Sequence, residues 1–463
     1  MNLIVLTLLL GVPSTLASVL LLQRLFTALF WYWFAWLVAL ISAEISAQLG
    51  FLPTIGPLAQ QIIIDAHIGA FVGFIVALAV ASLMLTKRQP QQNNRPRFVF
   101  SQRLLKHLSL FFLAVAVIHL VYRVSLVGDV GGVLFFQIRQ DFLALRDPLR
   151  ITQFSSIIFT LVLPIFALLG AEDHEQGDVR LKRLFPLYLA GLIHGIAMGG
   201  RIWLLMPVLY YIFSYLLLSD VRDRSSQRIL FKRLRLITLT VIILFVALGG
   251  MKSVDSSTRA ASEHWYQNPS GILSPMVYAG VALASLDATA WNATQIRPLH
   301  GQLLFSWFAE RLNSLGLLNN HMTQEEVVRR DLVYLVDWRV AATQCTVLCL
   351  AVGDFGLSNV VLAMAILMGL CQLASTGWQG QGYMRQILAT IAVMAAFMTV
   401  QDTWFGIPVN AVGIILTIPL IWLIGKYNKK DVLLDRRTKL RERIGTPLSG
   451  LVPQRPSDVA RQG

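Results

Sequence analysis

The sequence predicts an all-α polytopic membrane protein with about eleven transmembrane helices. Of its 463 residues, 56% are hydrophobic and only 14% are charged, and the mean hydropathy is +0.63. Soluble domains carry about 25% charged residues. Apolar runs of about 20 residues recur along the chain, and lipid accepts such runs only as helices, because helices satisfy their own backbone hydrogen bonds. The composition therefore excludes a soluble enzyme.

The apolar runs predict the spans in order. They cover residues 2–22, 25–49, 67–86, 107–127, 152–170, 185–199, 202–219, 235–251, 357–375, 386–401 and 408–425. The first run lacks a basic leading region and is followed at once by Arg24 and a second run, so we expect a membrane helix and not a cleaved signal peptide. The apolar run 340–352 is too short to cross and is expected to be re-entrant or interfacial.

Basic residues in three connectors predict the orientation. Connectors 87–106 and 220–235 and the tail from Lys426 are all rich in Lys and Arg, and all fall on one side of an eleven-span chain. Positive loops stay in the cytoplasm, which puts the N-terminus outside and the C-terminus inside. The chain then divides into about eight N-terminal spans (1–251), a long external segment (252–356), about three C-terminal spans (357–428) and a basic cytoplasmic tail (429–463).

The outer side has an excess of Arg over Lys. Sorting by this topology places 27 basic residues inside, eight of them Lys, and 12 outside, with Lys252 as the single Lys. Arginine presents a planar fork that holds carboxylate or phosphate at two points, whereas Lys suits a hydrated surface charge. These arginines either pair with the acidic residues of the same side or converge on an anionic substrate.

Arg201 is the most informative single residue. It ends the run Gly199-Gly200-Arg201, which joins two apolar helices with almost no loop. Glycines allow a close approach of backbone to ligand, and a helix N-terminus favours anions. Arg201 is expected to bind phosphate or pyrophosphate; the alternative is a side chain that reaches out to the lipid headgroups.

Arg123 ends a span on the same predicted side. After it, stretch 129–150 interleaves aromatic and aliphatic residues with Arg139, Arg146 and Arg150, a pattern typical of an interfacial amphipathic helix. This stretch either contacts headgroups or lines a site for a lipid-linked phosphate.

The long segment 252–356 gathers the chemistry-bearing residues. Its stretch Ser274–Trp291 is apolar enough to dip into the interface. A carboxylate or imidazole beside arginines can act as general base toward a hydroxyl, or can form a structural ion pair. The candidate bases are Asp354, His300 and Asp337, and the neighbouring candidate ligands are Arg259, Arg297, Arg339 and Tyr278.

The sequence contains no motif for metal-dependent, serine-hydrolase or ATP-driven chemistry. The three cysteines lie in apolar surroundings without a CxxC or Cys/His pattern, which indicates no zinc site. HExxH, GxSxG and Walker sequences are missing from the chain. We therefore expect neither a metal nor a cofactor.

The chain resembles the Wzy-type oligosaccharide repeat-unit (O-antigen) polymerases in a series of pieces. These are, in order, Gly199-Gly200-Arg201, Tyr278-Ala279-Gly280, Gly301 to Phe305, Leu312 to Gly316, and Thr346 through Asp354-Phe355-Gly356 into a helix with Gly369. The family more often has Ser at the position of Gly200, Asn at Thr343 and Gly at Asn359.

The resemblance implies a GT-C-like fold and a metal-independent, inverting glycosyltransferase at the periplasmic face of the bacterial inner membrane. Its substrate would be an undecaprenyl-pyrophosphate-linked oligosaccharide. The growing chain would leave its pyrophosphate for a hydroxyl of the next unit, building O-antigen or a related surface polysaccharide. A chain-length regulator and a flippase are possible partners; nucleic acid is not expected.

Two other functions stay open. A related ligase that moves glycan from lipid to an acceptor would share the spans and the arginine chemistry. A flippase or exporter of lipid-linked saccharide would need a polar pathway through the spans. Glu44 and His194 are nearly alone among ionisable residues deep in the predicted spans, which disfavours the exporter.

Overall fold

A computed structural model describes most of the predicted helices and little of the long segment. It describes residues 2–50, 52–85, 98–127, 149, 151–198, 202–219, 227–228, 231–232, 235, 279–280, 282–284, 286, 333–335, 340–342, 346–377, 382–400, 413 and 415–428. These residues are almost all helical, which confirms the all-α membrane class. Six helices are long and apolar enough to cross a membrane: Leu3–Leu22, Ala28–Gln48, Pro57–Met84, Gln102–Leu126, Phe154–Gln176 and Leu357–Gly377.

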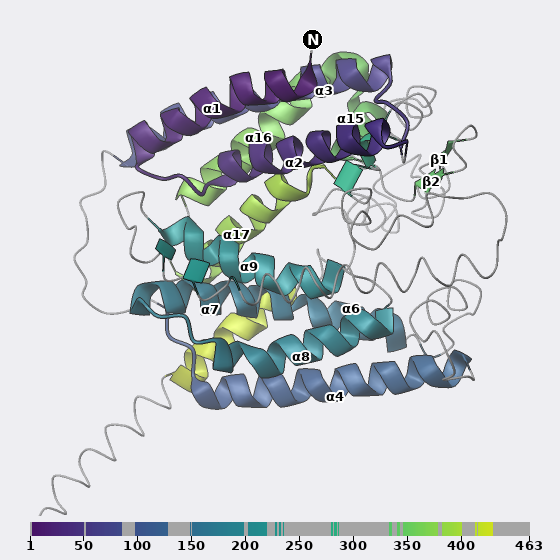
Figure 1. Ribbon diagram of the computed structural model, residues 1–463. Coiled ribbons are helices and arrows are strands. Elements are labelled where there is room, and N and C mark those ends of the chain that lie inside the picture. Colours follow the sequence, from purple (N-terminus) through teal and green to yellow (C-terminus); the bar gives the residue numbers. More distant parts are fainter. Residues whose placement is uncertain are drawn as a thin grey trace, which may run out of the picture.

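The described helices form two groups (Figure 1). The first contains α1 (Leu3–Leu22), α2 (Ala28–Gln48), α3 (Pro57–Leu85), α15 (Val347–Phe355) and α16 (Val360–Gly377). The second contains α4 (Gln102–Val127), α6 (Ile151–Thr160), α7 (Val162–Gln176), α8 (Leu181–Met198) and α9 (Ile202–Leu218). Helix α17 (Tyr383–Met398) packs against members of both groups, and a further apolar helix runs over Ile415–Asn428.

Three predicted elements differ from the observed ones. The third helix begins at Pro57 and not near 67, and the fifth span is made of α6 and α7, which meet at Leu161. Run 340–352 is divided between strand β2 (Val340–Ala342), paired antiparallel with β1 (Val333–Leu335), and the nine-residue helix α15. Predicted span 235–251 lies outside the described residues except for 235. The count of eleven spans therefore stays a prediction.

Helices α3 and α16 make the closest contact in the first group. A Cβ atom added at Gly69 would lie 2.2 Å from the carbonyl oxygen of Val361, and one at Gly73 would lie 2.1 Å from that of Ala365. On the other side, Gly369 faces the backbone of Gly73. Small residues four apart let membrane helices approach closely, so that van der Waals contact and not the hydrophobic effect joins them.

A buried histidine ties the first three helices together. The Thr7 hydroxyl of α1 donates to the Leu3 carbonyl oxygen at 2.8 Å, so it accepts from Nε2 of His67, 3.0 Å away. Nδ1 of the same ring then accepts from the Tyr32 hydroxyl of α2 at 3.2 Å. Side chains of two helices, α1 and α2, thus satisfy one fully buried side chain on α3.

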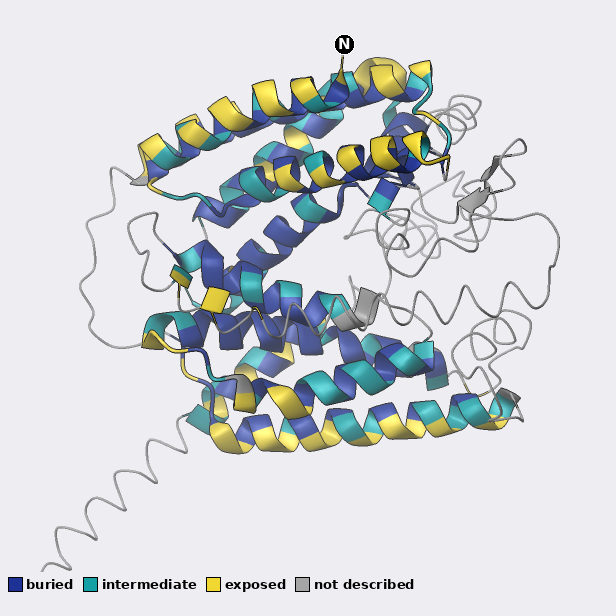
Figure 2. Cartoon of the chain, viewed as in Figure 1, coloured by how far each residue is buried: buried dark blue, intermediate teal, exposed yellow. Residues whose placement is uncertain are grey.

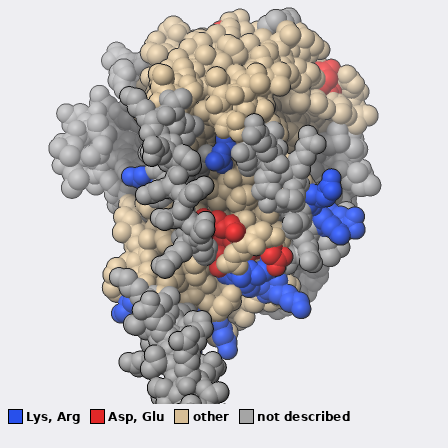
Figure 3. Space-filling model, turned by 90° about the vertical axis from the view of Figure 1, so that its left-hand side faces the viewer, with Lys and Arg blue, Asp and Glu red and all other residues tan. Residues whose placement is uncertain are grey.

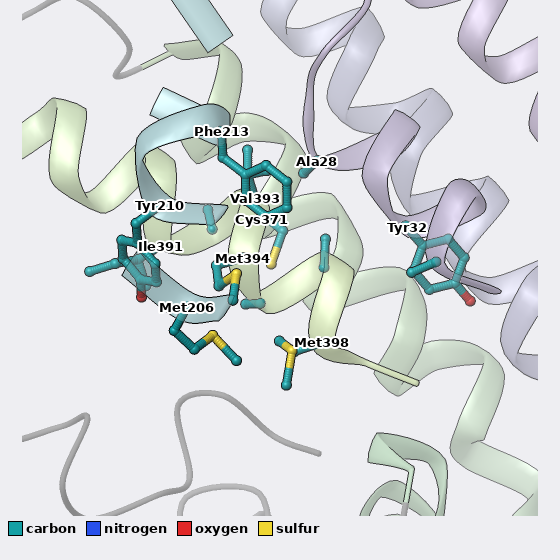
Figure 4. Packing of buried hydrophobic residues seen from close by; sticks show 14 of the residues in the cluster. Ala28, Tyr32, Met206, Tyr210, Phe213, Cys371, Ile391, Val393, Met394 and Met398 are labelled. Carbon is teal, nitrogen blue, oxygen red and sulfur yellow. The ribbon is translucent and has the colours of Figure 1, made fainter. Parts of the chain in front are cut away.

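Helix α17 links the two groups through polar contacts. Gln386 Nε2 of α17 donates to the Ser214 hydroxyl of α9 at 2.9 Å. Trp36 Nε1 of α2 donates to the Thr399 hydroxyl, just past α17, at 3.0 Å. Apolar side chains of α9, α16 and α17 pack together in the core, among them Phe213, Cys371 and Met394 (Figure 4).

The outward faces of the helices are apolar. On α1 and α4, Leu20 and Val121 are 79% and 62% exposed. Exposed residues follow the outer faces of α1, α2 and α4, whereas buried residues fill the middle (Figure 2). A protein surface with long apolar stripes of this kind suits a hydrocarbon solvent.

Helix ends that the sequence assigns to the cytoplasm meet at one end of the molecule, which we call the Arg24 end. Arg24 Nη1 donates to the carbonyl oxygens of Leu217 and Leu218 at 3.1 and 3.2 Å, after α1 and at the end of α9. The Tyr383 hydroxyl at the start of α17 donates to the Val99 carbonyl oxygen at 3.0 Å, just before α4. Phe98 N–H donates to Glu175 Oε2 of α7 at 2.9 Å.

Ion pairs gather at the Arg24 end. Arg180 and Arg183, at the start of α8, pair with Glu172 and Asp173 in the last turns of α7, and the closest contact joins Arg183 to Glu172 at 2.6 Å. The Tyr211 hydroxyl donates to Asp173 at 2.7 Å. Figure 3 shows acidic and basic side chains side by side on this face. Burying two carboxylates requires such partners.

We expect Gly73→Ala to disrupt the fold, because the added methyl group would push α3 away from the α16 backbone. Overpacking of a tight interface costs about 1–3 kcal/mol or more. Thermal unfolding of the detergent-purified protein measures the effect. Gly425→Ala is the control, because a Cβ atom there meets nothing within 4 Å. Equal Tm values for the two variants would contradict the close contact.

Candidate functional site

Arg123 is a buried cation at the opposite end of the molecule from Arg24. It lies in the last turns of α4, is 2% exposed, and its Nε donates to the Ala197 carbonyl oxygen of α8 at 3.1 Å. Every other Lys or Arg within the described residues belongs to the opposite ends of the helices or to the segments that follow them. We call the end where α4 and α8 finish and α9 begins the Arg123 end.

The contact of Arg123 with Ala197 adjoins the glycine junction. Helix α8 ends at Met198 and α9 begins at Ile202, so Gly199-Gly200-Arg201 is the whole connector between them. Arg201 itself lies outside the described residues. The bond joins Arg123 to Ala197, four residues before Arg201. That Arg123 and Arg201 belong to one site stays a prediction.

A histidine pair lies one helical turn deeper. His119, four residues before Arg123 on α4, and His194, three residues before Ala197 on α8, are both fully buried. Their Nδ1 atoms are 3.3 Å apart. On α6, the Ser155 hydroxyl lies 3.2 Å from His194 Nδ1, and the Phe159 ring stacks on the His194 ring at 4.0 Å between centroids.

Hydroxyl groups of α6 continue this polar interior. The buried Ser156 lies in hydrogen-bond distance of the Thr152 carbonyl oxygen at 2.8 Å and of Met198 Sδ at 3.4 Å. We call the set the α4–α6–α8 polar cluster; its members are His119, Arg123, Thr152, Ser155, Ser156 and His194. A fixed guanidinium beside imidazoles and hydroxyls is suited to an anion rich in oxygen atoms.

Asp354 lies in the other helix group. It is fully buried in the last turn of α15, and Gly356 follows with a φ of +78°. Helix α15 packs against α16 and α3, whereas Arg123 lies on α4 against α8 (Figure 1). A carboxylate without exposed surface needs hydrogen-bond or ionic partners. The role of Asp354 as a base stays a prediction.

A short piece of the long segment packs against α2. Residues 279–280, 282–284 and 286 are helical, and a Cβ atom on Gly280 would lie 2.7 Å from the Cα atom of Ala43. Leu283 and Leu286 are fully buried. This part of stretch Ser274–Trp291 is therefore built into the helix bundle.

The remaining predicted site residues lie outside the described residues. They are Arg201, Arg146, Arg150, Arg259, Arg297, Arg339, Tyr278, His300 and Asp337. Of the predicted site residues, the structure therefore describes Arg123 and Asp354.

Sequence reasoning missed part of the cluster and misplaced one acid. Glu44 is exposed on α2, where it accepts from Gln48 Nε2, and does not lie deep in the bundle. His67 and His119 are fully buried, in addition to His194. The scarcity of buried ionisable residues therefore no longer argues against an exporter. The spacing of four between His119 and Arg123 was the available signal, because such residues share a helix face.

We expect Arg123→Met to leave the Tm unchanged or raise it. Burying a guanidinium carries a desolvation penalty, which an apolar side chain of similar length does not carry. Thermal unfolding in detergent measures this, with the exposed Arg103→Met on the same helix as control. A large fall in Tm for Arg123→Met alone would assign Arg123 to structure and not to ligand binding.

No family model, no curated protein and no solved structure matches the chain. The resemblance to Wzy-type polymerases therefore depends on the residue pieces quoted from the sequence. The membrane class and the helix arrangement follow from the chain's own residues.

Proposed function

We propose that this protein polymerises undecaprenyl-pyrophosphate-linked oligosaccharide repeat units at the outer face of the inner membrane. The observation that carries the proposal is Arg123, a buried guanidinium at the end of the bundle opposite the basic connectors, bonded to the helix that leads into Gly199-Gly200-Arg201. A buried guanidinium carries a desolvation penalty, and an anionic leaving group bound beside it would offset part of that penalty.

The reaction makes two demands on the protein. Pyrophosphate gains charge as it leaves, and fixed cations in a low-dielectric site stabilise that charge without reorganising. Arg123 and Arg201 would form the floor of the site. Arg146, Arg150, Arg259, Arg297 and Arg339, with Tyr278 for the saccharide, would complete it from the segments outside the spans.

The second demand is removal of a proton from the acceptor hydroxyl. The leaving oxygen of pyrophosphate accepts the electron pair of the broken sugar bond, and the acceptor oxygen forms the new one. Asp354, His300 or Asp337 would take the proton of the hydroxyl as general base. No metal is required in this scheme, because the arginines would carry the leaving charge.

The proposed orientation of the protein in the membrane follows from the difference in basic residues between the Arg24 end and the Arg123 end. The segments that meet at the Arg24 end adjoin the connectors rich in Lys and Arg that are expected in the cytoplasm. The Arg123 end would then face the periplasm, where the lipid-linked units are polymerised.

The direct experiment reconstitutes the purified protein in liposomes with one defined undecaprenyl-pyrophosphate-linked repeat unit. A ladder of products longer than one unit supports the polymerase. Transfer of one glycan from lipid to an added acceptor, without a ladder, would favour the ligase. Movement of the unmodified unit across the bilayer would favour the exporter.

In this assay we expect Arg201→Lys and Arg123→Lys each to lower kcat by about a hundredfold or more, the loss found when one preorganised charge donor is removed. Lys keeps the charge but cannot present a planar fork. The control is Arg103→Lys, which makes the same exchange at an exposed site of α4. Full activity of both lysine variants would indicate that the arginines serve only the lipid headgroups.

A further inference from the structure

We infer that the His119–His194 pair is a positioning element that holds Arg123 at the junction between α8 and α9. This role rests on the proposed function, because it assigns the pair to the binding of the leaving pyrophosphate. The pair lies one turn from Arg123 on α4 and one turn from Ala197 on α8. Two polar contacts, one turn apart, therefore connect the same two helices.

The inner part of this helix pair cannot set the axial position by itself. Toward the Arg24 end, the buried residues are mostly apolar, with Phe112 and Ala116 on α4 and Leu187 and Ala190 on α8; Ser109 of α4 is a buried polar exception. In lipid, apolar side chains gain no hydrophobic free energy from meeting one another, so in that part only the fit of side-chain shapes distinguishes one register from another. Hydrogen bonds between fixed atoms do distinguish registers.

The histidine contact is specific in its hydrogen placement. Two Nδ1 atoms at 3.3 Å form a hydrogen bond only if one carries hydrogen and the other does not, so the neutral rings take opposite tautomers. Ser155 on α6 contacts Nδ1 of His194, and Phe159 covers the face of that ring. Helix α6 thereby fixes the orientation of His194, and His194 fixes α4.

The histidine pair thereby determines where the Arg123 guanidinium lies. The bond from Arg123 Nε to the Ala197 carbonyl oxygen needs α4 and α8 at one axial offset, and the histidine pair enforces that offset. A shift by one turn would move the helices about 5.4 Å relative to each other. The histidines thus act through Arg123 and do not touch the substrate.

A double-mutant cycle tests this inference. His119→Leu, Arg123→Lys and the double variant are compared with wild type in the liposome assay. We expect His119→Leu to lower kcat/KM by about tenfold to a hundredfold, the effect of a misplaced catalytic group. The double variant should be no worse than Arg123→Lys, because the histidine acts only through the arginine. Losses that multiply would overturn the inference.

Conservative and control variants separate positioning from folding. The Asn amide stands as many bonds from the Cα atom as Nδ1 of His, so His119→Asn should restore most of the kcat/KM that His119→Leu loses. His107→Leu makes the same exchange at an exposed site of α4 and should be fully active. A His119→Asn variant as impaired as His119→Leu would overturn the inference.

Binding of inorganic pyrophosphate, measured by calorimetry on the same variants, distinguishes the two failures. If the double variant binds pyrophosphate no worse than Arg123→Lys but no variant polymerises, the positioning role is supported and the polymerase is rejected. If the wild type polymerises but the losses of the two single variants multiply in the double variant, the polymerase is supported and the positioning role is rejected. Neither pyrophosphate binding nor polymerisation in the wild type would reject both.

Discussion

The close contact of α3 with α16 is the constraint on which the first helix group depends. Gly69 and Gly73 bring the α3 backbone against the α16 backbone at Val361 and Ala365. Since α15 precedes α16 directly and also packs against α3, the same contact holds Asp354 in the bundle. In lipid this joining cannot come from the hydrophobic effect, so it requires side chains small enough for the backbones to meet.

The second group is held in a different way. Helices α4, α6 and α8 meet through apolar residues toward the Arg24 end and through the α4–α6–α8 polar cluster toward the Arg123 end. A polar interior at one end contributes modestly to stability, because such bonds between membrane helices are weak on average. It fixes orientation and supplies donors, which are the properties that binding an anion requires.

The two ends of the molecule hold their arginines in different ways. At the Arg24 end, arginines pair with Glu172 and Asp173, and the ionic groups satisfy one another. At the Arg123 end, the buried guanidinium donates to the Ala197 carbonyl oxygen and so connects α4 to the end of α8.

The sequence by itself determined the membrane class and most helix bounds and singled out Arg123 as a candidate, because apolar runs and their flanking charges are local signals. Only the tertiary structure decided that α3 begins at Pro57, that Glu44 is exposed, and that His119 meets His194. The physical reason is that packing decides which face of an all-apolar helix meets a partner. Periodicity is weak where lipid and protein interior are equally apolar.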